Sequence, residues 1–310
     1  MQYCFLNACA ILIPEVYPLL GDYRLRIAIP GRGRLREGTE KLLSMAGIEL
    51  PPPGDRMLVI GDERSGYQLQ SVRAKDIIGL VRSGSADVGI TGRDLVMEYG
   101  DETVSELMQL DFGKCSLCIA VPENSPATNA SQLADGTRVA TMFPNITERF
   151  FESIGKRVQL VTVSGTTEAA PMIGIADAIS DIVDTGTTLR NNGLRSLCAV
   201  AESTAVIITG TKAIETRMEE IDEFLCLIRS VQDAKSKRYL MVNVPSGSES
   251  DVRRLLKGIE GPTSMRISGR DDFFALHAVV DSGEINRLIP GLKAMGCTGI
   301  LVSRIERLVP

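Results

Sequence analysis

The densest group of residues that could do chemistry lies in SDIVDTGTTLRNNG, residues 180–193. Two carboxylates, Asp181 and Asp184, stand at the end of an apolar run that is typical of a buried strand. A turn of hydroxyls and glycine follows them: Thr185, Gly186, Thr187 and Thr188. Backbone N–H groups and hydroxyls at the start of a helix form a nest that binds phosphate. The local pattern equally fits an ordinary helix cap, with Thr at the N-cap and Asp favouring the helix dipole.

A second group of candidate residues is basic and lies nearer the amino terminus. In GRGRLREG, Arg32 and Arg34 occupy a glycine-rich turn between a strand predicted at 24–29 and a helix predicted at 39–46. The turn misses the dinucleotide fingerprint because its third glycine comes two places late, and it misses the P-loop because Thr rather than Lys follows the last glycine. Taken singly, each arginine fits a solvated surface charge as well as a phosphate ligand.

Cysteine and histidine chemistry is not favoured. Cys115 and Cys118 form a single C-x-x-C inside an apolar run, with no second pair and no nearby histidine, so buried thiols are expected rather than a zinc or redox site. The only histidine is His277, in the carboxy-terminal stretch FFALHAVV. A Ser-His or Cys-His mechanism is therefore not expected in the preceding two-thirds of the chain.

Composition limits the class of protein. The chain has 310 residues, 44% hydrophobic and 24% charged, and this length suffices for two or three domains with their own cores. A net charge of −5 argues against nucleic-acid or membrane-surface partners, which need broad basic surfaces. Seven cysteines without framework spacing favour reduced thiols and a cytoplasmic location.

The first 22 residues differ from the rest. They are apolar, contain no Lys or Arg, and are interrupted by Pro14, Glu15 and Pro18. That composition fits neither a signal peptide nor a membrane span, so we expect an extension outside the fold.

Strands that alternate with helices from residue 23 to about 230 indicate parallel, doubly wound α/β sheets, arranged most economically as two lobes. We expect lobe I at 23–118 plus 205–230 and lobe II at 119–204. The polar run DAKSKR suits a domain boundary, and the elements after Lys237 show the order β-α-β-β-α-β, which predicts a ferredoxin-like α+β domain at 231–310.

Several motifs together resemble one enzyme family. EAAPMIGIADAISDIVDTGTTL, from Glu168 to Leu189, resembles the signature of ATP phosphoribosyltransferase, the family that opens histidine biosynthesis. LRIAI with GRL at 25–35, VRAKDI at 72–77, DVGITGRD at 87–94 and LDFGKCSLCIAVP at 110–122 follow the family in the same order. SKRYLMVNVP and GILVSRIE resemble the regulatory domain of its long form. The resemblance covers residue 23 to near the carboxyl end.

The resemblance implies a periplasmic-binding-protein-like (type II) catalytic region, followed by an ACT-like regulatory domain. It implies roles for three sets of residues. The set for 5-phosphoribosyl-1-pyrophosphate (PRPP) is Glu168, Asp181, Asp184, Thr185, Gly186, Thr187 and Thr188. The set for ATP is Arg32, Arg34, Leu35, Arg73 and Asp94. The catalytic set is Arg34 and Arg56. Pro30-Gly31-Arg32 departs from the family's Lys-bearing turn, with Arg32 as the substitute cation.

The implied reaction is attack of adenine N1 of ATP on ribose C1, with inversion and loss of pyrophosphate chelated by Mg²⁺. Such a reaction needs no protein nucleophile, so positioning and charge stabilisation by arginine and Mg²⁺ would supply the catalysis. The family also implies inhibition by histidine at the terminal domain, with Thr263 and Thr298 as effector contacts, and a homo-oligomer, either dimer or hexamer.

Two other functions compete with this interpretation. A solute-binding or effector-sensing protein could use the same two-lobed fold, but it would not need acids beside a Thr-Gly-Thr-Thr turn. A phosphoribosyltransferase that acts on a free base is the other alternative. The spacing of Glu168 and Gly174 ahead of Asp181, together with the added domain, weighs against it.

Overall fold

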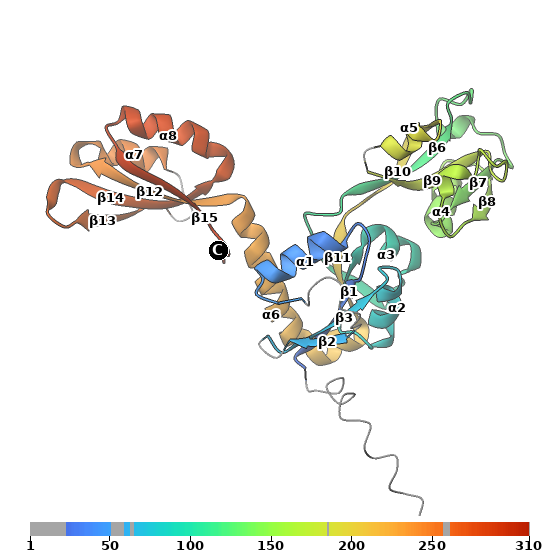
Figure 1. The fold of residues 1–310 in the computed structure, drawn as a ribbon, viewed down its shortest axis with the longest axis horizontal. Coiled ribbons are helices and arrows are strands. Elements are labelled where there is room, and N and C mark those ends of the chain that lie inside the picture. The colour runs from blue at the N-terminus through green and yellow to red at the C-terminus, as the bar shows by residue number, and fades with distance from the viewer. Residues whose placement is uncertain (1–22, 51–58, 63–64, 185, 257–260, 310) are drawn as a thin grey trace, which may run out of the picture. The chain divides into compact units, whose positions relative to one another are not determined.

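The computed structural model describes residues 23–50, 59–62, 65–184, 186–256 and 261–309. Two compact units divide the chain: the described residues of Met1–Lys41 with Ile48–Ile221, and those of Leu42–Gly47 with Asp222–Pro310. The first unit contains two α/β sheets, around which we define lobe I and lobe II (Figure 1). The expected domain bounds stay a prediction, and the expected extension at 1–22 lies outside the described residues.

Lobe I is built on a six-stranded sheet with the order β2-β3-β1-β4-β11-β5. Its strands are β1 (Leu25–Pro30), β2 (Val59–Asp62), β3 (Tyr67–Val72), β4 (Val88–Gly92), β5 (Val104–Gln109) and β11 (Ala205–Gly210). Its helices are α1 (Arg36–Met45), α2 (Asp76–Ser83) and α3 (Arg93–Tyr99). The apolar face of α2 packs on the sheet, where Ile77 and Val81 join Ala28 and Ile208 in one buried cluster. Turns that contain glycine join β1 to α1 and β4 to α3, so both helices begin near the end of a strand.

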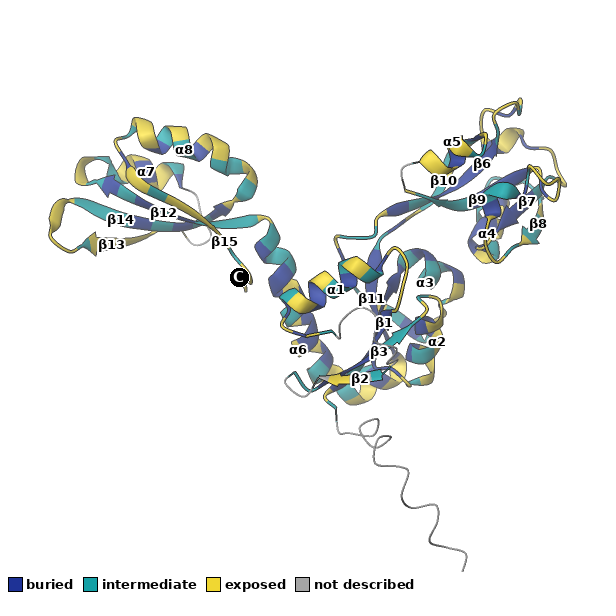
Figure 2. Ribbon diagram, viewed as in Figure 1, coloured by how far each residue is buried: buried dark blue, intermediate teal, exposed yellow. Residues whose placement is uncertain are grey.

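Lobe II is built on a five-stranded sheet with the order β10-β6-β9-β7-β8. Its strands are β6 (Cys115–Pro122), β7 (Arg138–Thr141), β8 (Gln159–Thr162), β9 (Ala178–Val183) and β10 (Leu194–Ser203). Its helices are α4 (Pro144–Ser153) and α5 (Thr187–Asn191), with 3₁₀ turns η2 (Ala130–Gln132) and η3 (Thr167–Ala169). Phe151 of α4 packs with Ile119 and Val139 of the sheet. Figure 2 shows buried residues along the strands of each sheet and exposed residues on the outer faces of the helices.

The two sheets are mixed rather than wholly parallel, so that part of the sequence-based expectation is wrong. In lobe I, β1 runs parallel to β3 and β4, but β11 is antiparallel to both β4 and β5. In lobe II, β7 is parallel to β8 and β9, but β6 is antiparallel to β9 and β10. The chain leaves lobe I after β5, enters lobe II at β6, and returns from β10 to β11. The strands next to these two crossings, β6 and β11, run antiparallel to their neighbours.

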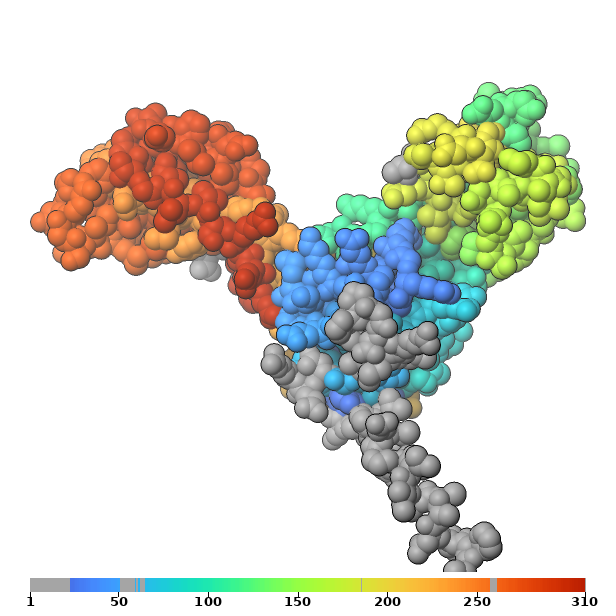
Figure 3. Space-filling model, viewed as in Figure 1, coloured from blue at the N-terminus to red at the C-terminus, as the bar shows by residue number. Residues whose placement is uncertain are grey.

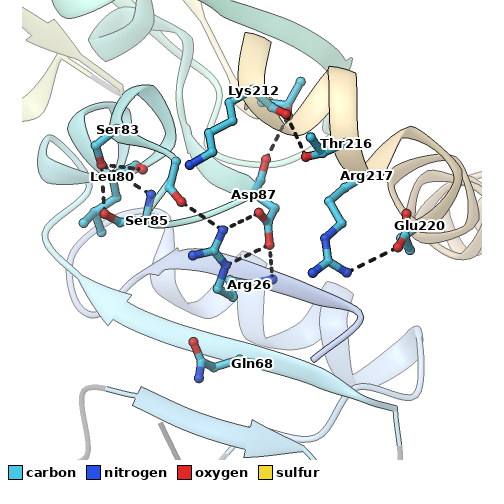
Figure 4. A network of polar contacts seen from close by, with 12 residues as sticks. Arg26, Gln68, Leu80, Ser83, Ser85, Asp87, Lys212, Thr216, Arg217 and Glu220 are labelled. Carbon is cyan, nitrogen blue, oxygen red and sulfur yellow. Dashed lines mark hydrogen bonds and ion pairs between the residues drawn. The ribbon is translucent and has the colours of Figure 1, made fainter. Parts of the chain in front are cut away.

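A partly buried ion pair joins two central strands of lobe I (Figure 4). Arg26 of β1 donates from Nε to Asp87 Oδ2 at 3.0 Å and from Nη2 to Asp87 Oδ1 at 2.6 Å. The hydrogen bond to Asp87 is the main cause that raises the pKa of Arg26, and the charge of Asp87 raises it further. Thr209 of β11 donates to the Asp87 carbonyl at 2.8 Å, which ties a third strand to the pair. A bidentate guanidinium contact of this kind fixes geometry as well as charge.

The carboxy-terminal domain is a four-stranded antiparallel sheet with the order β13-β14-β12-β15. The strands are β12 (Lys237–Pro245), β13 (Thr263–Ile267), β14 (Arg270–Asp281) and β15 (Thr298–Arg304); the helices are α7 (Glu249–Leu255) and α8 (Ile285–Ala294). Both helices contribute to one core with the strands, as Val252 and Leu288 pack with Leu240 and Leu276. The expected ferredoxin-like order and the fold class as a whole are confirmed.

One long helix, α6 (Thr211–Lys235), precedes this domain, and Arg217 within it has non-helical backbone angles. Searched over the described residues, the helices include none that combines the length and the apolar character of a membrane span.

Candidate functional site

The turn between β9 and α5 is open to solvent. Gly186 has φ 72°, a left-handed conformation that favours glycine, and it stands at the N-cap of α5. The alternative with Thr at the N-cap is therefore wrong. Thr187 and Thr188 are exposed, and α5 lies at the surface of lobe II (Figure 3). Thr185 lies outside the described residues. The turn thus presents hydroxyls and helix-start amides rather than a packed interior.

The two aspartates of this strand end have different surroundings. Asp181 is half-buried within β9, and its burial raises the pKa of its carboxyl group; the neighbouring charge of Glu168 raises it further. The N–H of Ile182, which donates to Asp181 Oδ1 at 2.8 Å, and the nearby hydroxyl of Thr167 act in the opposite direction. Asp184, beyond the end of β9, is exposed. Of the two acids that the sequence singles out, Asp181 is therefore half-buried and Asp184 is exposed.

The SGTTE loop brings Glu168 to the same place. Thr166 adopts the left-handed conformation at φ 50°, which is uncommon for a β-branched residue, and it starts the 3₁₀ turn η3. The turn leaves Glu168 near Asp181 and buries Thr167 to 1% exposure. Within the described part of the chain, Thr167 Oγ1 makes no hydrogen bond of normal geometry. Glu168 and Asp181, 13 residues apart in sequence, thus form one acidic corner.

On lobe I, Arg34 is held by a buried acid. Its Nη2 lies 3.4 Å from Asp94 Oδ1 and 3.5 Å from Asp94 Oδ2, and its Nη1 donates to the carbonyl of Gly113. Asp94 is the second residue of α3 and only 2% exposed. Ser203, the last residue of β10, donates to Asp94 Oδ1 at 2.6 Å and accepts the Asp94 N–H at 2.9 Å. The guanidinium is thereby aimed before any ligand is present.

Cys115 connects the two groups of residues. It is the first residue of β6, directly opposite Ser203 of β10 in the sheet, and the next pair along β6 is Ser116 with Val183. Burial is the main cause that raises the pKa of the Cys115 thiol; among the smaller causes are the charges of Arg34, Asp94 and Asp184. Those three groups therefore all lie within electrostatic range of one thiol. The register places the end of β10, whose Ser203 contacts Asp94, and the end of β9, which leads to Asp184, at adjacent residues of β6.

The remaining candidates divide into three kinds. Arg32 and Arg73 are exposed, whereas Leu35 is 4% exposed and packs in the core, so only its backbone is open to contact. Arg56 lies outside the described residues. Thr263 starts β13 and Thr298 starts β15, and these strands form opposite edges of the terminal sheet. One chain alone does not bring the two threonines together.

The cysteine prediction agrees with the structure. Cys115 and Cys118 are both buried free thiols on β6. Burial is also the main cause that raises the pKa of Cys118, which makes its thiolate less accessible.

Sequence reasoning missed Ser203. It lies 109 residues from Asp94 along the chain, and a serine at the end of a strand has no distinguishing pattern. Its partner could be found only once β6 and β10, the hinge strands next to the crossings between the lobes, were placed, because both hydrogen bonds cross from lobe II to α3.

Comparisons with known proteins identify the family of this chain. The ATP phosphoribosyltransferase (HisG) family profile matches residues 73–230, and the HisG C-terminal domain profile matches residues 234–307. The ATP phosphoribosyltransferase of Gemmatimonas aurantiaca is 44% identical over 295 residues, covering 92% of this chain and 100% of that protein. That of Methanocaldococcus jannaschii is 38% identical over 288 residues, with the same coverage.

A solved structure also aligns with the chain. It is the ATP phosphoribosyl transferase (HisG:HisZ) complex from Thermotoga maritima, 26% identical with a TM-score of 0.58, covering 66% of this chain and 96% of that chain. Together with the two family matches, which reach from the catalytic region into the terminal domain, this assigns the protein. The chain belongs to the ATP phosphoribosyltransferase (HisG) family, in its long form, and is a phosphoribosyl-transferring enzyme.

Proposed function

We propose that this chain transfers the phosphoribosyl group of PRPP to N1 of ATP and releases pyrophosphate, as the first step of histidine biosynthesis. The observation that carries the proposal is that adjacent residues of β6 pair with Ser203, which holds the Arg34–Asp94 pair, and with Val183, which directly precedes Asp184. A transfer between two phosphorylated substrates needs a cation and hydrogen-bond acceptors within reach of one reacting carbon. Family membership supplies the chemical class.

Lobe II is proposed to hold PRPP. The amides after Gly186 and the hydroxyls of Thr187 and Thr188 would take the 5-phosphate, because a helix start favours an anion. Asp184 is exposed beside this turn and would accept hydrogen bonds from the ribose hydroxyls. Asp181 and Glu168 form the acidic corner behind it and would complete the sugar contacts.

Lobe I is proposed to hold ATP and the leaving group. During displacement, the N1–C1 bond forms while the bond from C1 to pyrophosphate breaks, so positive charge grows on the ribose and negative charge on pyrophosphate. Arg34 is held by Asp94 and would stabilise the departing phosphates with its guanidinium. Arg32 and Arg73 are exposed and free to contact the triphosphate from the surface.

Mg²⁺ is proposed as part of the substrate, chelated by the pyrophosphate of PRPP. Residues 23–309, apart from the gaps named above, hold no group of three or more His, Cys, Asp or Glu side chains placed to bind a metal. Glu168 and Asp181 are a pair of neighbouring acids that fit the water shell of a substrate-bound Mg²⁺, since this ion keeps several of its waters. The ion would neutralise the leaving group.

Regulation by histidine and a homo-oligomer, dimer or hexamer, are also proposed for this chain. Thr263 and Thr298 lie on opposite edge strands of the terminal sheet. A histidine site that used both would join edges of two copies, which would couple inhibition to assembly.

The free thiols of the described cysteines fit the proposed cytoplasmic location.

The test mixes the full-length protein with ATP, Mg²⁺ and PRPP and measures pyrophosphate release, with histidine titrated into the same assay. Asp184→Ala should weaken PRPP binding strongly, because ribose hydroxyls would lose a charged acceptor worth about 1.5–3 kcal/mol per hydrogen bond. Asp135→Ala, which removes an exposed acid elsewhere in lobe II, is the matched control. Ligand binding without pyrophosphate release would favour a solute-binding protein, and release with a free base in place of ATP would favour the other transferase class.

A further inference from the structure

Helix α3 carries two buried acids, and the site described above uses only one. Asp94 and Glu98 are four residues apart, on one face of the helix, and are 2% and 4% exposed. Asp94 is paired with Arg34 and Ser203. A buried carboxylate needs hydrogen bonds or a counter-charge to offset its lost hydration, so the partners of Glu98 show what it does.

Glu98 reaches from lobe I to the amino-terminal end of α4 in lobe II. Its Oε1 accepts the N–H of Asn145 at 3.0 Å, and its Oε2 accepts the N–H of Ile146 at 3.0 Å. Asn145 Nδ2 in turn donates to the Glu98 carbonyl at 3.0 Å. Both amides belong to the first turn of α4, where backbone donors lack helical partners and the dipole favours negative charge. One carboxylate thus caps a helix of the other lobe.

The capped turn is connected to the strand that carries the proposed PRPP acids. Thr147, in the same first turn of α4, is hydrogen-bonded through Oγ1 to Ser180 Oγ at 2.9 Å, and both residues are fully buried. Ser180 lies in β9, directly before Asp181. The position of α4 therefore sets the position of this strand end.

At the other end of α3, Asp94 holds Arg34, so one short helix contacts both halves of the site. We propose that Glu98 is a positioning residue, which fixes lobe II against lobe I so that Arg34 and the acids of β9 face each other at the separation that transfer requires. This inference rests on the proposed function. Among the described residues, the Glu98 carboxylate accepts hydrogen bonds from Asn145 and Ile146 of α4, so its effect would be exerted through α3 and α4.

The test compares Glu98→Ala and Glu98→Gln with Glu202→Ala in the full-length protein. Glu202 is the control because it is an exposed acid that joins two hinge strands, accepting from Ser116 Oγ at 2.8 Å. Glu98→Ala should lower kcat about tenfold to hundredfold, since misplacement by about 1 Å costs up to 10²-fold. PRPP affinity, which depends on lobe II, should change less than about twofold. Glu98→Gln keeps one acceptor and should restore part of kcat, and Glu202→Ala should match the parent protein.

Two further measurements separate positioning from simple support of α4. Amide hydrogen exchange at Asn145 and Ile146 should speed up in Glu98→Ala, while exchange in β7 and β9 should not change. The effects of Glu98→Ala and Arg34→Ala on kcat should be less than additive, because both disturb one alignment.

Unchanged kcat in both Glu98 variants, or unchanged exchange at the two amides, would overturn the inference. So would a parallel loss of kcat and PRPP affinity that Glu98→Gln does not relieve. If the parent protein released no pyrophosphate, the proposed function would fail instead, and hydrogen exchange alone would decide whether Glu98 caps α4.

Discussion

Arg34 in lobe I and Asp184 in lobe II approach Cys115 from different sheets, yet the folded chain constrains them to different degrees. Arg34 has a buried acid, a carbonyl and, through Ser203, a hinge strand to fix its direction. Asp184, Thr187 and Thr188 are exposed. One half of the proposed site is thus organised without substrate, whereas the other half is exposed and would be completed by a ligand. The comparison shows that the Arg34 guanidinium is the more firmly held part of the proposed site, as a charge-stabilising group should be.

The strongest challenge to that comparison is removal of the fixed cation. Arg34→Ala should lower kcat for pyrophosphate release by about 10²–10³-fold, the loss expected when one charge-stabilising donor is removed. Arg34→Lys should recover only a small part, because a point charge cannot replace the fork that spans Asp94 and Gly113. Steady-state kinetics checks both variants, and full activity of Arg34→Lys would contradict an aimed guanidinium.

Ser203→Ala tests whether the hinge strand fixes Arg34 indirectly. The change removes a donor to Asp94 Oδ1 and an acceptor for the Asp94 N–H, so we expect kcat to fall about tenfold, as one or two hydrogen bonds of about 1 kcal/mol are lost. Ser116→Ala, at a half-buried position of the neighbouring strand β6, should have almost no effect. An equal loss of kcat in the two variants would show that β6 and β10 are sensitive to any substitution and that Ser203 has no specific role in fixing Arg34.

Asp181, at the end of β9, should give the stability of the protein a dependence on pH. Because burial raises the pKa of folded Asp181 above its unfolded value, its contribution to stability is present at low pH and is lost as pH rises through the folded pKa. Asp181→Asn should therefore raise the melting temperature at pH 7.5, and the gain should vanish at acid pH. The exposed Asp184→Asn should show no such gain. Calorimetry across pH decides, and equal shifts would remove the distinction between the two acids.

Two glycine substitutions give the smallest effects. Gly186→Ala should destabilise the protein by about 1 kcal/mol, because φ 72° is strained for any side chain even where space is open. Gly79→Ala, inside α2 with nothing within 4 Å of the added carbon, should stabilise by about 0.5–1 kcal/mol. Thermal unfolding of both variants checks the opposite signs. A stabilising Gly186→Ala would mean that the turn is not held in its left-handed form.

The sequence predicts elements well where one local signal dominates. The apolar run before Asp181 predicts β9, glycine turns predict the helix starts that follow strands, and the β-α-β-β-α-β order predicts the terminal domain. β5 (Val104–Gln109) was missed because, as an edge strand with a largely exposed face, it lacks clear alternation.

The candidate site is predictable in its residue types but not in its connections. The acids and the Thr-Gly turn are visible in one stretch, whereas the partners of Asp94 and Glu98 lie in β10 and α4. These contacts depend on the crossing between sheets, which no local pattern encodes. Burial, which distinguishes Asp181 from Asp184, likewise depends on the neighbouring strand and the SGTTE loop.

The four-residue spacing of the acids on α3 also restricts how the chain can vary. Inserting or deleting a single residue between Asp94 and Glu98 would rotate one carboxylate by about 100° around the helix axis, away from its partner. Changes in chain length are therefore tolerable in the surface loops around this helix but not within its single turn between the acids.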